Sequence, residues 1–242
     1  MTVQGESGGA AAAPTQSARH FMTSFALFAM LPGVVIFACA GDLSWGAGWL
    51  YVGTLWIATV GTRLLALRFS PALIDERTCS VRRRDVEPWD RLIMPVIALL
   101  GPLGSWILAG LSFRFGWLTG IALAVRLGAL IALVAGSALV TWSMLTNPFF
   151  SAVVRIQRDR GQEVISRGPY RLVRHPGYLG MLVANLATPI VLDAPWTFIP
   201  IGVVAVLLVL RTALEDRTLC SGLNGYADFA RATRARLVPG VW

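Results

Sequence analysis

The residues most suited to chemistry lie in a polar stretch between residues 162 and 180 of this 242-residue chain. Two sequences within it, Gly168-Pro169 and His175-Pro176-Gly177, each predict a tight turn. Tyr170 lies between the turns, and Tyr178 follows the second one. Apolar runs on both sides place the stretch near a membrane, where irregular backbone is tolerated only if protein or a water-filled cavity surrounds it. The stretch therefore predicts a polar pocket at a membrane face.

A second candidate for chemistry is the pair Arg211 and Glu215, which are four residues apart. On a helix this spacing puts both side chains on one face. The pair has two interpretations, an ordinary surface ion pair or two members of a ligand site. His175 has a similar ambiguity, because a single histidine beside a proline is commonly a turn residue. No cysteine or histidine spacing is typical of a metal site, and we expect no metal.

The composition predicts that membrane helices position these residues. The chain is 55% hydrophobic and only 14% charged, whereas a soluble domain carries about a quarter charged residues. Its formal net charge of +8 comes from arginine, since the sequence contains no lysine. A basic balance can indicate a nucleic-acid partner. Here the arginines lie between apolar runs and more simply report membrane orientation, so we expect a lipid bilayer and no nucleic acid.

Four apolar runs are long enough to cross a bilayer as helices, which takes about 20 residues. They are Phe21–Ala40, Trp45–Leu67, Leu92–Phe113 and Leu118–Leu145. Two shorter runs, Leu179–Leu192 and Pro195–Leu210, meet at Asp193-Ala194 and predict a helical hairpin that crosses or re-enters the membrane. The expected fold class is therefore an all-α integral membrane bundle of about four spans plus this hairpin, with a cytoplasmic loop and a C-terminal helix.

The arginine distribution predicts how the bundle is oriented. Arginines concentrate in the segments 70–91 and 151–178 and in the tail after residue 210, which places these segments and the N-terminus in the cytoplasm. We expect three regions: a disordered tail over residues 1–18, four membrane helices over 19–145, and a catalytic region over 146–242.

The C-terminal motifs resemble a known family, that of the isoprenylcysteine carboxyl methyltransferases, over roughly residues 140–242. The resemblance rests on an ordered set: Gly168-Pro169-Tyr170-Arg171, Arg174-His175-Pro176-Gly177-Tyr178-Leu179-Gly180, Arg211, Glu215-Asp216, Tyr226, Phe229 and Leu237-Val238-Pro239. The chain departs from the family at Asp216, where a second glutamate is usual.

The resemblance implies S-adenosylmethionine as a methyl donor bound on the cytosolic face. Arg211 corresponds to the family arginine that faces the acceptor, and Glu215 would contact the cofactor. The other implied cofactor residues are Gln162, Glu163, Val164, Ile165, Tyr170, His175, Pro176, Gly177 and Tyr178.

The chemistry of methyl transfer is consistent with this assignment. The enzyme would mainly align donor and acceptor and exclude water. A carboxylate acceptor needs a positive partner and no general base, so the residues favour a carboxylate or an ionised thiolate. We expect a small or lipidic acceptor that enters from the bilayer. Two other functions remain open, an NADPH-dependent reductase of a sterol-like or enone substrate and a non-enzymatic transporter or scaffold.

Overall fold

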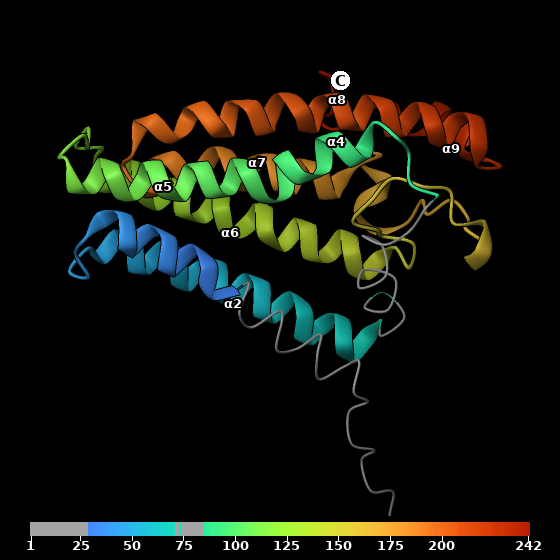
Figure 1. Ribbon diagram of the computed structural model, residues 1–242. Coiled ribbons are helices and arrows are strands. Elements are labelled where there is room, and N and C mark those ends of the chain that lie inside the picture. The colour runs from blue at the N-terminus through green and yellow to red at the C-terminus, as the bar shows by residue number, and fades with distance from the viewer. Residues whose placement is uncertain (1–28, 71–72, 74–84) are drawn as a thin grey trace, which may run out of the picture.

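The protein is a bundle of helices with an irregular region at one end, as seen in the computed structural model (Figure 1), which describes residues 29–70, 73 and 85–242. No strand occurs within those ranges. The predicted tail over residues 1–18 and most of the 70–91 loop lie outside them. The longer helices are Ala29–Ala40, α2 (Gly46–Phe69), α4 (Asp90–Pro95), α5 (Gly101–Arg114), α6 (Leu123–Thr146), α7 (Pro176–Val191), α8 (Phe198–Gly222) and α9 (Tyr226–Ala232).

Within the described part of the chain, four segments have the length and apolarity of membrane spans: Gly46–Phe69, Asp90–Arg114, Leu123–Thr146 and Pro195–Gly222. Large apolar side chains in these helices face outward, for example Ile57, Ile131 and Val206, whose exposed fractions are 69%, 70% and 68%. Such a surface is stable only against another apolar phase. The prediction of an all-helical integral membrane protein is thus confirmed.

The last span differs from its predicted form. The apolar run was expected to end near Leu210 and to be close to the lower limit for crossing, whereas α8 continues without a break to Gly222. Arg211 and Asp216 do not end the helix because both are buried against partners of opposite charge. The polar residues expected at the end of this helix therefore lie within it.

The segment Asp90–Arg114 crosses as one continuous helix although it contains Pro95 and Pro102. A proline inside a helix lacks the backbone N–H that would bond to the residue four positions earlier. The turn just before Pro102, Val96–Leu100, is a wider π-helical turn. This local widening accommodates the proline without breaking the span.

Among the described residues, α6 and α7 form the most extensive helix pair. A Cβ built on Gly136 would lie 2.6 Å from the carbonyl oxygen of Gly180 and 2.8 Å from the backbone nitrogen of Ala184. A Cβ on Gly180 would likewise lie 2.5 Å from the carbonyl oxygen of Gly136. Small residues at both positions let the two backbones touch, as is common between membrane helices.

Replacing Gly136 by alanine should separate this pair and destabilise the protein, by about 1–3 kcal/mol, because a backbone cannot move aside as a side chain can. Thermal unfolding in detergent measures the effect. The control is Gly128→Ala on the same helix, where a Cβ would meet nothing within 4 Å. Equal melting temperatures for the two variants would contradict the close approach.

At the end of the bundle away from the irregular region, Asp193 holds the connections together. Its carboxylate accepts hydrogen bonds from the backbone N–H groups of Thr119, Gly120 and Ile121 and from the Thr119 hydroxyl, at 2.6–3.3 Å. Burial alone would raise the pKa of Asp193, but these donors outweigh it and the pKa is lowered. Asp193 therefore ties the α5–α6 connection to the α7–α8 connection in its ionised form.

The lowered pKa predicts acid sensitivity at this end of the bundle. A carboxyl whose pKa is lower in the folded state contributes stability above its unfolded value, ordinarily 3.8, and this contribution is lost as the pH falls through the folded value. The melting temperature should therefore fall more steeply below about pH 4 in the wild type than in Asp193→Asn. Parallel pH profiles of the two proteins would show that Asp193 contributes nothing.

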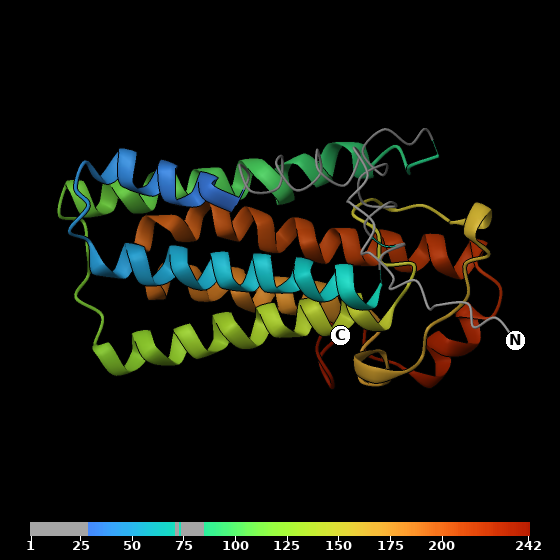
Figure 2. The ribbon, with the colours of Figure 1, turned by 90° about the horizontal axis from the view of Figure 1, so that it is seen from below.

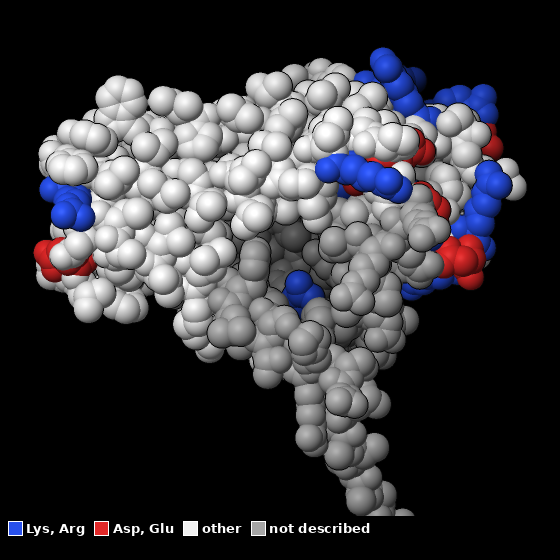
Figure 3. Space-filling model, viewed as in Figure 1, with Lys and Arg blue, Asp and Glu red and all other residues white. Residues whose placement is uncertain are grey.

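Charged residues gather at the opposite end, where the irregular chain and α9 lie (Figures 1 and 3). In Figure 2 the same end carries the segments that connect α6 to α7 and α8 to α9. The middle of the bundle is almost free of charge on the face shown in Figure 3. Most of the charged residues visible in Figure 3 therefore lie at one end of the membrane helices.

Candidate active site

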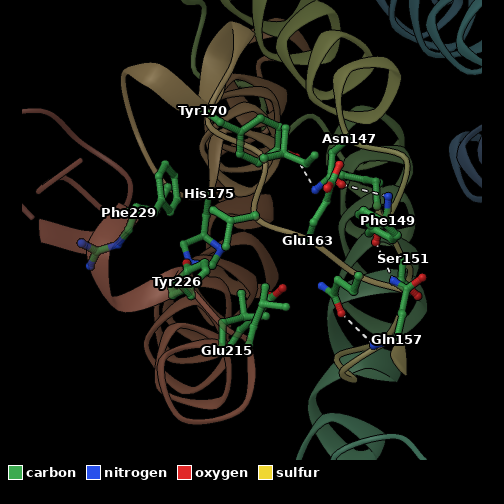
Figure 4. Close-up of a pocket in the computed structure, with 18 of the residues that line it drawn as sticks. Asn147, Phe149, Ser151, Gln157, Glu163, Tyr170, His175, Glu215, Tyr226 and Phe229 are labelled. Atoms are coloured by element: carbon green, nitrogen blue, oxygen red, sulfur yellow. Dashed lines mark hydrogen bonds between the residues drawn. The ribbon is translucent and has the colours of Figure 1, made fainter. Parts of the chain in front are cut away.

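A pocket opens among the segments at the charged end of the bundle (Figure 4). One wall comes from the chain after α6 and holds Asn147, Phe149, Ser151 and Gln157, as Figure 4 shows. The facing wall comes from the start of α7, the C-terminal half of α8, and α9. The first wall also includes Phe150, Val153 and Arg155. The remaining residues that line the pocket are Gln162, Glu163, Val164, Ile165, Tyr170, Arg174, His175, Gly177, Tyr178, Glu215, Leu219, Leu223, Tyr226 and Phe229.

Nine of the eleven residues predicted for the site line this pocket. They are Gln162, Glu163, Val164, Ile165, Tyr170, His175, Gly177, Tyr178 and Glu215. The two exceptions are Pro176, which is buried in the first turn of α7, and Arg211, which lies behind the wall. The loop before α7, the start of α7 and the C-terminal half of α8 therefore converge on one space.

Two carboxylates face the pocket, Glu163 and Glu215. Glu215 accepts a hydrogen bond from the Tyr178 hydroxyl at 2.5 Å. Among the described residues, no hydrogen bond reaches the side chain of Glu163. The two pocket arginines already have acidic partners: Arg155 pairs with Asp85 and Asp159 at 2.8 Å, and Arg174 with Asp216. The available charge in this part of the pocket is thus negative.

Asp216 is the hub of the wall formed by α8. Its buried carboxylate contacts Arg174 at 2.8 Å and Arg236 at 2.9 Å, and it accepts a hydrogen bond from the Tyr226 hydroxyl at 3.0 Å. The His175 ring nitrogen Nε2 lies 3.4 Å from it. Asp216 therefore joins the loop before α7, the helix α9 and the C-terminal segment to α8.

The C-terminal segment is also attached by its backbone. The N–H groups of Arg174 and His175 donate to the carbonyl oxygens of Ala235 and Arg236, at 2.9 Å and 3.0 Å. The Arg236 guanidinium lies over the Trp242 ring, 4.9 Å from its centroid. These contacts hold residues 235–242 against the His175 loop and so fix one side of the pocket.

The phenol of Tyr170 links the loop before α7 to the end of α6 and the residue after it. It accepts a hydrogen bond from the Asn147 amide and donates one to the Ser143 carbonyl oxygen, both at 3.3 Å. Burial raises the pKa of Tyr170 and also that of Tyr226. Both phenols therefore stay protonated and act as hydrogen-bond donors at neutral pH.

Gln157 fixes the shape of the wall that follows α6. Its buried amide donates to the Phe149 carbonyl oxygen at 2.6 Å and accepts from Arg160, also at 2.6 Å. Its backbone N–H donates to the Gln162 side chain at 2.7 Å. The chain from 149 to 162 is thereby folded into a compact loop along the pocket.

Arg211 is buried behind Tyr178 and is held by Asp90 at the start of α4. Its Nε and Nη2 atoms donate to the two Asp90 carboxylate oxygens at 2.7 Å and 3.2 Å, and Nη2 also donates to the Ala152 carbonyl oxygen at 2.8 Å. The guanidinium carbon lies 5.1 Å from the centroid of the Tyr178 ring. Neither interpretation of the sequence included Asp90 as the partner of Arg211.

Sequence reasoning did not assign a site role to residues 147–157 or to α9. Tyr226 and Phe229 did carry part of the family resemblance, so their order along the chain was an available signal. Asn147, Phe149 and Ser151 offered none, since a polar residue followed by proline and phenylalanines is typical of many helix ends. Within the described ranges, no cluster of His, Cys, Asp or Glu has the arrangement of a metal site.

Comparison with known proteins agrees with the location of this pocket. Residues 129–221 match the model of the isoprenylcysteine carboxyl methyltransferase (ICMT) family. The match includes α7, nearly all of α8 and the loop that carries most of the pocket residues.

Two curated relatives, from the indica and japonica subspecies of Oryza sativa, are named probable protein-S-isoprenylcysteine O-methyltransferase. Each is 37% identical over 68 residues, which are 28% of this chain and 33% of the relative. The chain thus aligns with about a third of the length of these relatives. The match to the family model, residues 129–221, covers most of the residues that line the pocket.

Proposed function

We propose that the protein is a membrane methyltransferase that uses S-adenosylmethionine to methylate a small or lipidic acceptor. The observation that carries the proposal is the pocket itself, in which Glu163 and Glu215 face a space whose arginines are already paired. A negative pocket lined by aromatic rings suits a ligand that has a sulfonium, an ammonium group and an adenine ring.

The donor set on the pocket walls fits this cofactor. Glu215 would hold the amino group, which a carboxylate binds strongly through a charge-assisted hydrogen bond. The segment Gln162–Ile165 would lie along the cofactor. His175, Gly177 and Tyr178, at the start of α7, would close its remaining side. Pro176 begins α7 and would shape this end without a direct contact.

When bound, S-adenosylmethionine supplies an electrophilic methyl group that is transferred by in-line displacement. The residues of this chain contribute alignment and exclusion of water, which can account for most of the rate enhancement of such a reaction. A carboxylate or thiolate acceptor requires no general base. The isoprenylcysteine-type carboxyl acceptor named for the relatives meets this condition and would reach the site from the bilayer.

The membrane topology belongs to the same proposal. The pocket end of the bundle faces the cytoplasm, where the arginine-rich segments are retained. The helices α7 and α8 form a hairpin that enters the membrane from that side, and residues 146–242 form the catalytic region. Labelling of single cysteines placed at residues 42 and 158, with a reagent that does not cross the membrane, would test the orientation.

The test of the proposed function is binding followed by transfer. Purified protein in detergent or nanodiscs should bind S-adenosylmethionine in a calorimetric titration and should transfer the labelled methyl group to an S-farnesyl cysteine analogue with a free carboxylate. The methyl ester of that analogue is the control and should accept nothing. Absence of cofactor binding would overturn the proposal, while binding without transfer would overturn only the acceptor.

The electrostatics of the pocket argue against a nicotinamide cofactor. NADPH carries several phosphates, which proteins bind through unpaired arginines, lysines or backbone N–H groups. In the described pocket the arginines already pair with carboxylates and two further carboxylates face the space. A thermal-shift comparison of NADPH with S-adenosylmethionine separates the two functions, since only the second should raise the melting temperature. If the protein were a transporter or scaffold, neither NADPH nor S-adenosylmethionine should raise its melting temperature.

A further inference from the structure

The pair formed by Arg211 and Glu215 shows an arrangement that its spacing alone does not explain. The residues are one turn apart on α8, where a guanidinium and a carboxylate usually pair. In the structure each has a different partner. Arg211 donates to Asp90, and Glu215 accepts from Tyr178.

Asp90 is well placed to cause this separation. Its side chain is fully buried, and it accepts two hydrogen bonds from Arg211 and a third, at 2.7 Å, from the backbone N–H of Val154. The bonds to the Arg211 guanidinium involve two of its nitrogens, a geometry that directs as well as attracts. Asp90 lies outside the region that matches the family model, which begins at residue 129.

The Tyr178 side chain contacts both charged groups. The Arg211 guanidinium lies against the face of this ring, while the hydroxyl of the same residue reaches Glu215. Asp90 therefore contacts Arg211, Arg211 contacts the Tyr178 ring, and the Tyr178 hydroxyl contacts Glu215, while Tyr178 and Glu215 both line the pocket. If Arg211 were released from Asp90, Glu215 on the next turn of α8 would be the nearby carboxylate able to compensate its charge.

We propose that Asp90 is a positioning residue that holds the Arg211 guanidinium away from Glu215 and so keeps the Glu215 carboxylate available for a cationic ligand in the pocket. The inference rests on the proposed function for the identity of that ligand. It also assigns Arg211 a role through Tyr178 and Asp90, in place of a direct contact with the acceptor.

The first test measures S-adenosylmethionine affinity by calorimetry in a set of variants. Asp90→Asn should weaken binding about tenfold or more, because the freed guanidinium then competes for Glu215. Asp90→Asn/Arg211→Gln should recover most of the affinity, because the competing cation is gone. A double variant that binds as weakly as Asp90→Asn would overturn the proposal, since a purely structural role for Asp90 predicts no recovery.

Folding of the variants is controlled in two ways. Asp193→Asn also removes the charge of a buried, multiply hydrogen-bonded carboxylate, at the other end of the bundle, and should leave the affinity unchanged. Should Asp90→Asn not yield folded protein, Asp90→Asn/Arg211→Lys replaces it, because the double variant keeps an unpaired cation on a more flexible side chain. Its affinity should then be lower than that of Asp90→Asn/Arg211→Gln, and equal affinities would contradict the proposal.

A second test does not depend on the cofactor. In a protein whose three native cysteines are replaced by alanine, Glu215→Cys places a thiol at the position that the Arg211 guanidinium should approach once Asp90 no longer holds it. Adding Asp90→Asn should raise the rate of alkylation by iodoacetamide at pH 7 severalfold, because a nearby guanidinium favours the thiolate. Adding Arg211→Gln as well should reverse the increase.

The two tests separate the possible failures. If the wild type does not bind S-adenosylmethionine, the proposed function fails, and the alkylation rates still decide whether Asp90 restrains Arg211. If the wild type binds and the alkylation rate does not respond to Asp90→Asn, the positioning role is wrong while the proposed function stands.

Discussion

Replacing Glu215 by glutamine should weaken S-adenosylmethionine binding by about 10- to 100-fold while the protein remains folded. Glutamine preserves the shape of the side chain and can still accept a hydrogen bond from Tyr178, so the change removes mainly the charge. Hydrogen bonds to charged groups are worth about 1.5–3 kcal/mol, which corresponds to this range of affinity. Calorimetric titration in detergent measures the loss directly.

Two further variants separate the charge of Glu215 from its neighbours. Tyr178→Phe removes the hydroxyl that donates to Glu215 and leaves the carboxylate in place, so its effect on affinity should be smaller. Asp228→Asn removes an exposed carboxylate on α9 and should have no effect. If Glu215→Gln bound the cofactor as tightly as the wild type, Glu215 would not be the residue that recognises the amino group.

Replacing Asp216 by asparagine should destabilise the protein by about 3–5 kcal/mol, because Arg174 would lose its buried counter-charge. The side chains of Asp216 and Arg174 are 4% and 7% exposed, so water cannot compensate the loss. The same change releases Arg236 of the C-terminal segment and Tyr226, which lines the pocket. A melting temperature lowered by several degrees and increased proteolysis after residue 232 are expected together.

The matched control for Asp216 is again the exposed pair Asp228 and Arg231, whose side chains are 74% and 80% exposed. Asp228→Asn should change the free energy of unfolding by less than about 0.5 kcal/mol. If Asp216→Asn were equally mild, the buried network would not hold the pocket wall. An aspartate is suited to this role, since its carboxylate contacts Arg174, Arg236, Tyr226 and His175.

The comparison of Asp216 with Glu215 shows why adjacent carboxylates can have different roles. They are neighbours in the sequence, yet the helix points them about 100° apart. Glu215 faces the pocket, where an incoming ligand can meet it, and Asp216 faces Arg174, His175 and Tyr226. Adjacent positions on a helix do not share a face, so a single motif of two acids provides one carboxylate that faces the pocket and one that joins a buried network.

The sequence by itself determined the membrane character, most of the spans and the location of the pocket. Apolar length and composition are local properties, and they specify a membrane helix without reference to distant residues. The turns at Gly168-Pro169 and His175-Pro176-Gly177 are also local, and nine of the residues that the family resemblance implied for the site line the pocket.

Only the tertiary structure decided which charged residues pair. Asp90 and Arg211 are 121 residues apart and Arg174 and Asp216 are 42 apart, and no periodic pattern connects them. An unpaired buried charge costs so much free energy that each buried charged residue pairs with the opposite charge that the fold places nearest to it. For the same reason the end of α8 was predicted too early, because the sequence shows Arg211 and Asp216 as polar residues but does not show the partners that keep them inside the bundle.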